Sequence, residues 1–256
     1  MTRYLQYAFL LSSLLIGACT TTSEPQLSDE RLQQASDLNA ELGVRYMQQG
    51  NNERAMDKLQ KAIEQNEDNA RAHQFLGELY RRVGKPDEAA KHFLVALDLT
   101  PKDPSLLNNY AILLCDQKKF DDAQTNFEKA LNDPVYSGKA GIYANMAQCA
   151  EAQNKLKRAE EYYLKALKLD PRVPSANMGM AQITFDMGLY SQSRQYLERF
   201  LEQRKHNAQS LWLGILLERR AGNRNRVASY AILLKGRFPD SEEARKLRKL
   251  ESQGRL

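Results

Sequence analysis

Small, aromatic and aliphatic residues recur along this chain at fixed intervals. In residues 70–103 they lie 0, 3, 12, 16, 19 and 24 positions after Gly77. These positions hold Gly77, Tyr80, Ala89, Phe93, Ala96 and Pro101. Small residues at the first and third of these positions allow two helices to cross closely. Proline at the last position ends the second helix, because it lacks an N–H group. The pattern therefore predicts a pair of packed helices.

The same pattern occurs in three further segments, with the first position at Gly43, Ala111 and Ala147. Two weaker copies follow, and the second of them closes on Pro239. A two-residue insertion at 138–139 breaks the phase once. Six repeats result, over residues 36–69, 70–103, 104–137, 140–173, 174–207 and 208–241.

A 34-residue period with these landmarks resembles the tetratricopeptide repeat, a helix–turn–helix unit. The resemblance implies an all-α fold, a right-handed α-solenoid of about six repeats within residues 31–256. A single hairpin cannot bury its apolar face, so such repeats are stable only when they stack. The composition agrees, because 42% of the residues are hydrophobic and proline and glycine are few.

Apolar stripes flank the repeats, the first at Leu32, Ala35 and Leu38 and the second at Ala244, Leu247 and Leu250. Asp240 and Glu243 stand at the spacing of a capping box ahead of the second stripe. We therefore expect a helix over residues 242–256 that caps the solenoid.

Residues 1–18 have the layout of a secretory signal peptide, with Arg3 followed by an apolar run over residues 8–16. That run is too short to span a bilayer, which takes about 20 residues. The stretch from Leu15 to Cys19 resembles the lipobox of bacterial lipoproteins, in which the Cys is acylated and becomes the N-terminus. The alternative is an ordinary signal peptide with an incidental Cys. Residues 19–30 would then form the lipidated N-terminus and a flexible tether.

Acylation at Cys19 would place the protein in a membrane. The residue after Cys19 is Thr20, and no Asp stands there as the usual inner-membrane retention signal. By that sorting rule we expect a lipid anchor in the outer membrane, facing the periplasm.

The search for catalytic chemistry finds no known constellation. His73, His92 and His206 stand at no ligand spacing from another His or Cys, and the chain has no Gly-rich phosphate loop or Gly-x-Ser-x-Gly elbow. We expect no enzyme activity, no cofactor, no metal site and no small-molecule substrate.

Cys115 and Cys149 lie late in the first helices of the third and fourth repeats, which should stack side by side. An oxidising compartment permits a disulfide between them. The alternative is a pair of buried free thiols, because Cys also packs well as a small hydrophobe.

The concave face of such a solenoid is where a partner usually binds. Residues expected there include Val44, Met47, Gln74, Glu78, Arg81, Asn108, Ile112, Asp116, Gln148, Met178, Gln182, Phe185, Trp212 and Arg219. This mixture of polar and apolar groups suits an extended peptide or a helix. Trp212, the only tryptophan, is either a binding hot spot or part of the packing inside the last hairpin.

The net charge of +5 is unevenly distributed. Residues 204–256 contain 13 Lys and Arg against 5 Asp and Glu, whereas residues 20–203 contain 23 against 27. The basic end suggests an acidic partner or an anionic membrane surface, or it is simply a solvated helix surface. An exported protein meets little nucleic acid, so we expect none as a partner.

The chain also resembles the pilotin lipoproteins of type IV pilus biogenesis, the PilF/PilW family. The matching stretches are Leu107–Ala111, the turn Gln117–Phe120, the insertion with Pro134, Tyr136 and Gly138, and, in the last repeat, Asn207–Leu211, Leu213–Ile215 and Ala228–Tyr230. Generic repeats would not share such degenerate stretches.

The resemblance implies that the protein is not an enzyme, that it binds the pilus secretin subunit, and that it promotes the secretin's outer-membrane localisation and multimerisation. Pilus biogenesis and twitching motility would depend on it. Binding in that family is associated with an apolar groove near the first repeats, here Val44, Met47, Leu59, Phe75 and Tyr80. We expect a monomer. The competing hypothesis is a lipidated scaffold for β-barrel assembly or for regulation of peptidoglycan enzymes.

Overall fold

The computed structural model describes residues 28–254, and within that range it contains thirteen α-helices and no strand. They are α1 (Asp29–Gln48), α2 (Asn52–Gln65), α3 (Ala70–Arg82), α4 (Pro86–Leu99), α5 (Pro104–Asp116), α6 (Phe120–Leu131), α7 (Lys139–Ala152), α8 (Leu156–Leu169), α9 (Pro174–Asp186), α10 (Tyr190–Gln203), α11 (Ala208–Arg220), α12 (Arg224–Arg237) and α13 (Glu242–Ser252). The prediction of an all-α repeat solenoid is confirmed.

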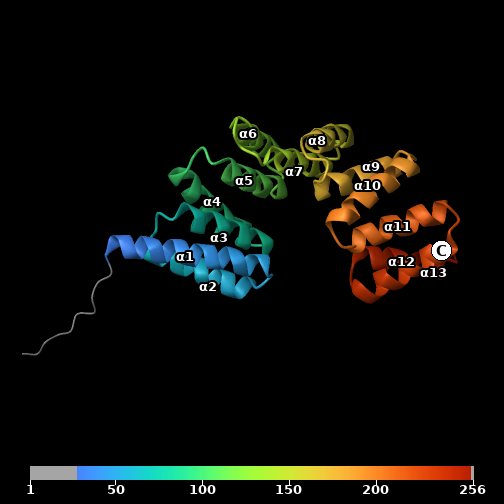
Figure 1. The fold of residues 1–256 in the computed structure, drawn as a ribbon, viewed down its shortest axis with the longest axis horizontal. Coiled ribbons are helices and arrows are strands. Elements are labelled where there is room, and N and C mark those ends of the chain that lie inside the picture. The colour runs from blue at the N-terminus through green and yellow to red at the C-terminus, as the bar shows by residue number, and fades with distance from the viewer. Residues whose placement is uncertain (1–27, 255–256) are drawn as a thin grey trace, which may run out of the picture.

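Consecutive helices pair into six antiparallel hairpins, and the hairpins stack into an arch with α1 at one end and α13 at the other (Figure 1). At the crown of the arch, α5 and α7 lie on the inside and α6 and α8 on the outside. The first helix of each hairpin contacts the first helix of the next, so odd-numbered helices form a continuous layer.

Each hairpin turn places one residue in the left-handed region of backbone conformation. Glycine occupies this place in four hairpins, at Gly50, Gly84, Gly188 and Gly222, because it adopts a positive φ without a steric penalty. The third and fourth hairpins use Lys118 (φ 61°) and Asn154 (φ 58°) instead.

Close helix crossing depends on the first landmark of the repeat. A Cβ atom built on Gly77 would lie 2.9 Å from the Phe93 ring, and one on Gly43 would lie 2.6 Å from Leu59 Cγ. Phe93 and Leu59 are fully buried. Glycine on one helix therefore leaves a space, and the large side chain of the partner helix fills it.

Two details at the ends differ from the expectation. Helix α1 begins at Asp29, ahead of the first predicted repeat, so the stripe at 32–38 belongs to the first helix of the first hairpin. Leu38 within it is 58% exposed. At the other end Ser241, not Asp240, caps α13, because its side chain accepts a hydrogen bond from the Ala244 N–H.

Candidate binding surfaces on the inner helices

Side chains join the inner helices to one another throughout the N-terminal half. The Gln74 amide of α3 donates to the Ser105 hydroxyl of α5 (3.1 Å), and the Asn145 amide of α7 donates to Asn108 of α5 (3.0 Å). Asn69, the N-cap of α3, donates to Ser36 of α1 (2.8 Å). Each of these bonds links neighbouring repeats.

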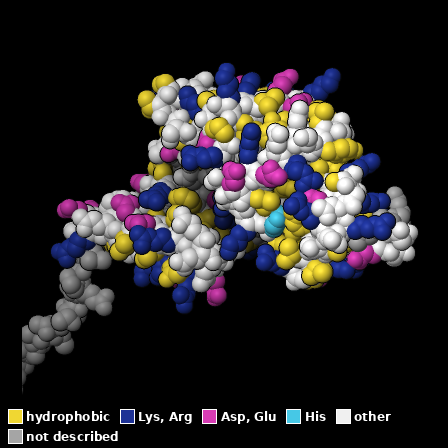
Figure 2. Space-filling model, turned by 45° about the vertical axis from the view of Figure 1, so that its right-hand side comes forward, with side chains coloured by type: hydrophobic (Ala, Val, Ile, Leu, Met, Phe, Trp, Pro, Cys, Tyr) yellow, Lys and Arg dark blue, Asp and Glu magenta, His cyan; other side chains and the backbone are white. Residues whose placement is uncertain are grey.

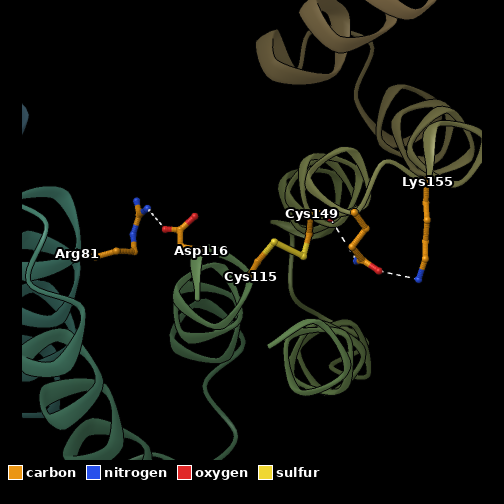
Figure 3. The surroundings of a disulfide bond; sticks show 6 residues. Arg81, Cys115, Asp116, Cys149 and Lys155 are labelled. Carbon is orange, nitrogen blue, oxygen red and sulfur yellow. Dashed lines mark hydrogen bonds and ion pairs between the residues drawn. A yellow bond between two sulfur atoms is a disulfide. The ribbon is translucent and has the colours of Figure 1, made fainter. Parts of the chain in front are cut away.

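An ion-pair network reinforces the link between α3 and α5. Arg81 donates to Glu78 of its own helix and reaches Asp116 of α5 at 2.8 Å (Figure 3). Glu78 is only 9% exposed and also accepts from Arg82. Burial opposes its ionisation, but the hydrogen bonds from Arg81 and Arg82 prevail and hold its pKa below the ordinary value.

The disulfide between Cys115 and Cys149 joins α5 to α7 in the structure (Figure 3). The two Cα atoms lie 5.8 Å apart, within the usual range for a disulfide. The bond spans the seam at which the two-residue insertion falls, so it joins the third and fourth repeats covalently. It also borders a hollow of about 290 Å³, lined by Ile112, Asn145 and Gln148 among others.

In the C-terminal half the links between inner helices stop. Among the residues that the structure describes, no hydrogen bond, ion pair or disulfide joins α7 to α9 or α9 to α11. A larger cavity, of about 610 Å³, lies there instead. Residues from α7, α8, α9, α10 and α11 line it, so it crosses the seams of the last three repeats.

The cavity has an apolar floor, a polar wall and a basic rim. Tyr163, Met178 and Phe200 are buried and form the floor. The wall carries uncharged polar side chains, namely Gln148, Ser175, Gln182, Asn207 and Gln209. Arg204 and Lys205 at the rim are exposed, and neither makes an ion pair with any described residue.

One acidic side chain, Glu151 of α7, also lines the cavity. The Tyr163 hydroxyl donates to it at 2.8 Å. Burial raises the pKa of Glu151, although that hydrogen bond opposes the shift. Burial raises the pKa of Tyr163 as well, so Tyr163 keeps its proton and remains the donor.

The five apolar residues predicted near the first repeats fall in two groups. Met47 and Leu59 belong to the core between the first two hairpins, and Phe75 and Tyr80 pack against it. Leu59 is fully buried beneath Gly43 and Met47 is 6% exposed, so the prediction that these two contact a partner is wrong. Close crossing of α1 and α2 requires both side chains to fill the core.

Tyr80 is half-buried within its own hairpin. Its ring stacks on His92 with centroids 5.4 Å apart, and Lys85 Nζ lies 6.0 Å from the ring centroid. Val44 and Phe75 are also half-buried, and Arg71 lies over the Phe75 ring. Of the five residues, Val44, Phe75 and Tyr80 therefore keep some accessible surface, and the Tyr80 ring is already stacked on His92.

The remaining predicted contact residues are spread along the arch. Asn108 is engaged with Asn145, and Ile112 lines the smaller hollow beside the disulfide. Trp212 is half-buried against the core of the last hairpin and α13, which favours the packing interpretation. Cys19 lies outside the described residues.

Sequence reasoning placed Gln148, Met178 and Gln182 on the inner face, and all three line the larger cavity. It missed Ser175, Arg204, Lys205 and Gln209. The excess of positive charge after residue 203 was the available signal, but it did not show which cations face the groove.

His73 and His92 meet inside the second hairpin, which their spacing in the sequence did not indicate. Their Nδ1 atoms are 3.0 Å apart, and His73 Nε2 lies 3.0 Å from the Glu67 carbonyl. Since a carbonyl oxygen only accepts, His73 carries its proton on Nε2. Its Nδ1 atom is then the acceptor, and His92 Nδ1–H donates to it. In the part of the chain that the structure covers, no group of three or more His, Cys, Asp or Glu side chains could hold a metal.

No helix between residues 28 and 254 is both long and apolar enough to cross a membrane.

Comparison with known proteins agrees with this architecture. Two family models, both described as tetratricopeptide repeat, match residues 41–104 and 103–172. Such repeats are typically non-enzymatic scaffolds for protein–protein interaction. Type IV pilus assembly protein PilF of Pseudomonas aeruginosa is 32% identical over 236 residues, which are 92% of this chain and 94% of PilF.

Solved structures show the same relationship. A structure of Pseudomonas aeruginosa PilF superposes with a TM-score of 0.70 at 30% identity, covering 86% of this chain and 99% of that one. The structure of PilW, described as a widely conserved type IV pilus biogenesis factor, gives 0.69 at 25% identity, covering 84% and 98%. The chain belongs to the PilF/PilW family of tetratricopeptide-repeat proteins of type IV pilus biogenesis.

Proposed function

We propose that this protein is an outer-membrane lipoprotein, acylated at Cys19, that binds the type IV pilus secretin subunit and promotes its localisation and multimerisation. The observation that carries the proposal is 32% identity to a type IV pilus assembly protein over 94% of that protein's length. Similarity over so much of the relative includes the atypical last repeat and the insertion, not the generic repeat alone.

The mechanism is delivery followed by assembly. Acyl chains on Cys19 would hold the protein at the membrane, since each buried CH₂ contributes about 0.8 kcal/mol and several chains bind far more firmly than one. The solenoid would then hold a secretin segment near the bilayer in which the ring forms. No bond is made or broken in either step, so no catalytic group is required.

The contact surface for the secretin lies on the inner helices α1 and α3 at the N-terminal end of the arch, around Val44 and Phe75. Both side chains are half-buried, and Phe75 packs on the core that joins the first two hairpins. An aromatic side chain held on a rigid core is a favourable anchor, because little side-chain entropy is lost on binding.

Membrane fractionation of cells carrying the wild type, Cys19→Ala or Phe75→Glu tests this function, with the protein and the secretin multimer probed together. We expect Cys19→Ala to leave the outer membrane and the multimer to be lost with it. Phe75→Glu should stay in the outer membrane but fail to support the multimer. Leu164→Glu is the matched control, because Leu164 is 45% exposed on the outer helix α8.

If the secretin multimer persists in the outer membrane while Cys19→Ala is mislocalised, the repeats serve another partner. The scaffold for β-barrel assembly or for peptidoglycan enzymes would then replace the proposed function. Thermal unfolding of purified Phe75→Glu separates lost binding from lost folding. A variant that has lost only binding unfolds at the same temperature as the wild type.

A further inference from the structure

We propose that the cavity between α7, α9 and α11 is a second binding site, which takes an extended acidic segment of another protein. It lies in the last three repeats, away from the apolar surface around Val44 and Phe75. The inference does not depend on secretin binding, and either can fail while the other holds.

The inner helices around this cavity are joined differently from those of the N-terminal half. Inner helices of the N-terminal half are joined by the Gln74–Ser105, Arg81–Asp116 and Cys115–Cys149 links, and the hollow beside the disulfide holds about 290 Å³. No such link crosses from α7 to α9 or to α11 in the described residues, and a cavity of about 610 Å³ occupies that place. This volume is within the usual range for ligand sites.

Hydrogen-bonding groups without a partner among the described residues border the cavity. The Gln148 and Gln209 side chains and the Ser175 hydroxyl make no hydrogen bond within the described structure, and all three border the cavity. Amide side chains both donate and accept, as an extended peptide backbone requires. The buried floor of Met178 and Phe200 can accept one apolar side chain of the segment.

The charge at the rim of the cavity favours an acidic occupant. Arg204 and Lys205 stand at the rim with no acidic partner among described residues, within a C-terminal region that carries 13 Lys and Arg against 5 Asp and Glu. Lys and Arg side chains are spread over this end of the arch, which is turned forward in Figure 2. Arg237 shares a neighbouring hollow with Arg204 and Lys205, and Glu202 is the one acidic residue in its lining, so the net charge there is still positive. An acidic segment is the complementary occupant.

Glu151 sets the direction of the bound segment. It comes from α7, whereas Arg204 follows α10, so the two lie on opposite sides of α9 in the stacking order. An acidic side chain would be repelled by an ionised Glu151 and attracted by the Arg204 side. The segment therefore places its acidic residue at the Arg204–Lys205 rim and its apolar residue over Met178.

A peptide fits this site better than an anionic membrane surface. Side chains from five helices, α7 to α11, line the cavity, and a planar bilayer does not enter such a hollow. The polar wall would also have no counterpart in a layer of headgroups. Anionic lipid therefore enters the experiment as an outcome that would overturn the proposal.

The test is fluorescence anisotropy with the full-length protein in detergent micelles. The probe is a fluorescein-labelled dodecapeptide of Glu, Leu and Ser, and the reference probe has Gln in place of every Glu. We expect the acidic probe to bind more tightly than the reference, and its affinity to fall with rising salt.

Arg204→Ala/Lys205→Ala should weaken binding of the acidic probe about tenfold, because two exposed charge contacts are lost. Arg224→Ala/Lys249→Ala is the matched control: it removes two exposed cations from the same half of the chain, outside the cavity lining, and should leave the affinity unchanged. Ser175→Trp, which fills the cavity without changing charge, should abolish binding while the thermal transition stays in place.

Equal losses in the two double variants would overturn the proposal in favour of a diffuse basic surface. Equal binding of the two probes, or none of the acidic probe, would overturn it as well. The proposal would also be overturned if binding of vesicles that contain anionic lipid required Arg204 and Lys205 while binding of the acidic probe did not.

Discussion

In the N-terminal half of the solenoid, side chains join each inner helix to the next, whereas α7, α9 and α11 of the C-terminal half stack without such links among the described residues. Both halves use the same hairpin, with a small residue opposite a large one. The difference lies in the seams between hairpins. A hollow of about 290 Å³ lies beside the disulfide, where α5 and α7 are joined. A cavity of about 610 Å³ lies where α7, α9 and α11 lack such links in the described part of the chain, although Arg194 of α10 pairs with Glu218 of α11.

The repeat pattern therefore determines how the two helices of a hairpin pack, but it does not determine the contacts between neighbouring hairpins. In a solenoid each repeat contacts only its neighbours, so seam contacts decide both the local stability and the shape of the inner face. We expect the N-terminal half to present a rigid apolar surface. The C-terminal half presents a polar cavity with a basic rim.

The largest effect is expected from breaking the disulfide. Cys115→Ser/Cys149→Ser should lower the free energy of unfolding by about 2–4 kcal/mol, because the covalent loop restricts the unfolded chain. Urea denaturation with and without a reducing agent measures this. The reductant should lower the stability of the wild type and leave the double variant unaffected; an equal response in both would contradict the account.

The next largest effect concerns Glu218, which is 2% exposed and pairs with Arg194 of α10 and Arg226 of α12. Glu218→Gln should cost about 1.5–3 kcal/mol, since it weakens charged hydrogen bonds in a buried site. Glu78→Gln is the corresponding change in the N-terminal half. Chemical denaturation of both variants at neutral pH compares the two networks directly.

The pH dependence of these two carboxylates has a definite sign. Burial opposes ionisation of Glu218, but Arg194 and Arg226 hold its pKa below the ordinary value of 4.5, as Arg81 and Arg82 do for Glu78. Their stabilising contribution is complete above that value and is lost as the pH falls through the lowered pKa. The stability lost on acidification should therefore be smaller in Glu78→Gln and Glu218→Gln than in the wild type.

A steric change tests the packing beneath the cavity. A Cβ atom on Gly179 would lie 2.3 Å from the Tyr163 ring, so Gly179→Ala should cost about 1–3 kcal/mol. Gly141→Ala is the control, because nothing lies within 4 Å of its Cβ position and alanine favours an exposed helix. Thermal unfolding should show a lower transition for the first and an unchanged or higher one for the second.

The smallest effect is expected at the surface link between α3 and α5. The Asp116 side chain is 53% exposed, so its ion pair with Arg81 is screened by water. Asp116→Asn should change the free energy of unfolding by less than about 1 kcal/mol. A larger loss would mean that the Arg81–Asp116 ion pair, rather than apolar packing, holds α3 and α5 together.

Much of the fold follows from sequence spacing, because the repeat has strict geometric requirements. Gly77 and Phe93 recur at fixed offsets since two helices can cross closely only where a small residue faces a large one. The details at the ends did not follow: Ser241 caps α13 where Asp240 was expected, because helix caps depend on local backbone geometry.

The sites were predictable only in part. Gln148 and Gln182 were placed on the inner face by helical periodicity, which holds in every repeat. Arg204 and Lys205 lie in a turn between helices, where no periodicity applies. Leu59 was misassigned as a contact residue, because the sequence alone does not distinguish an apolar side chain that faces a partner from one that packs in the core.

The central claim is that the two halves of the inner face bind different protein segments. Site-specific photo-crosslinking in living cells tests it most directly, with a photoreactive amino acid at position 75, at position 209 and, as the control on outer helix α8, at position 164. The account predicts secretin adducts at 75, adducts with a different, acidic protein segment at 209, and none at 164. Secretin adducts at 209 but not at 75, or equal adducts at 164, would contradict it.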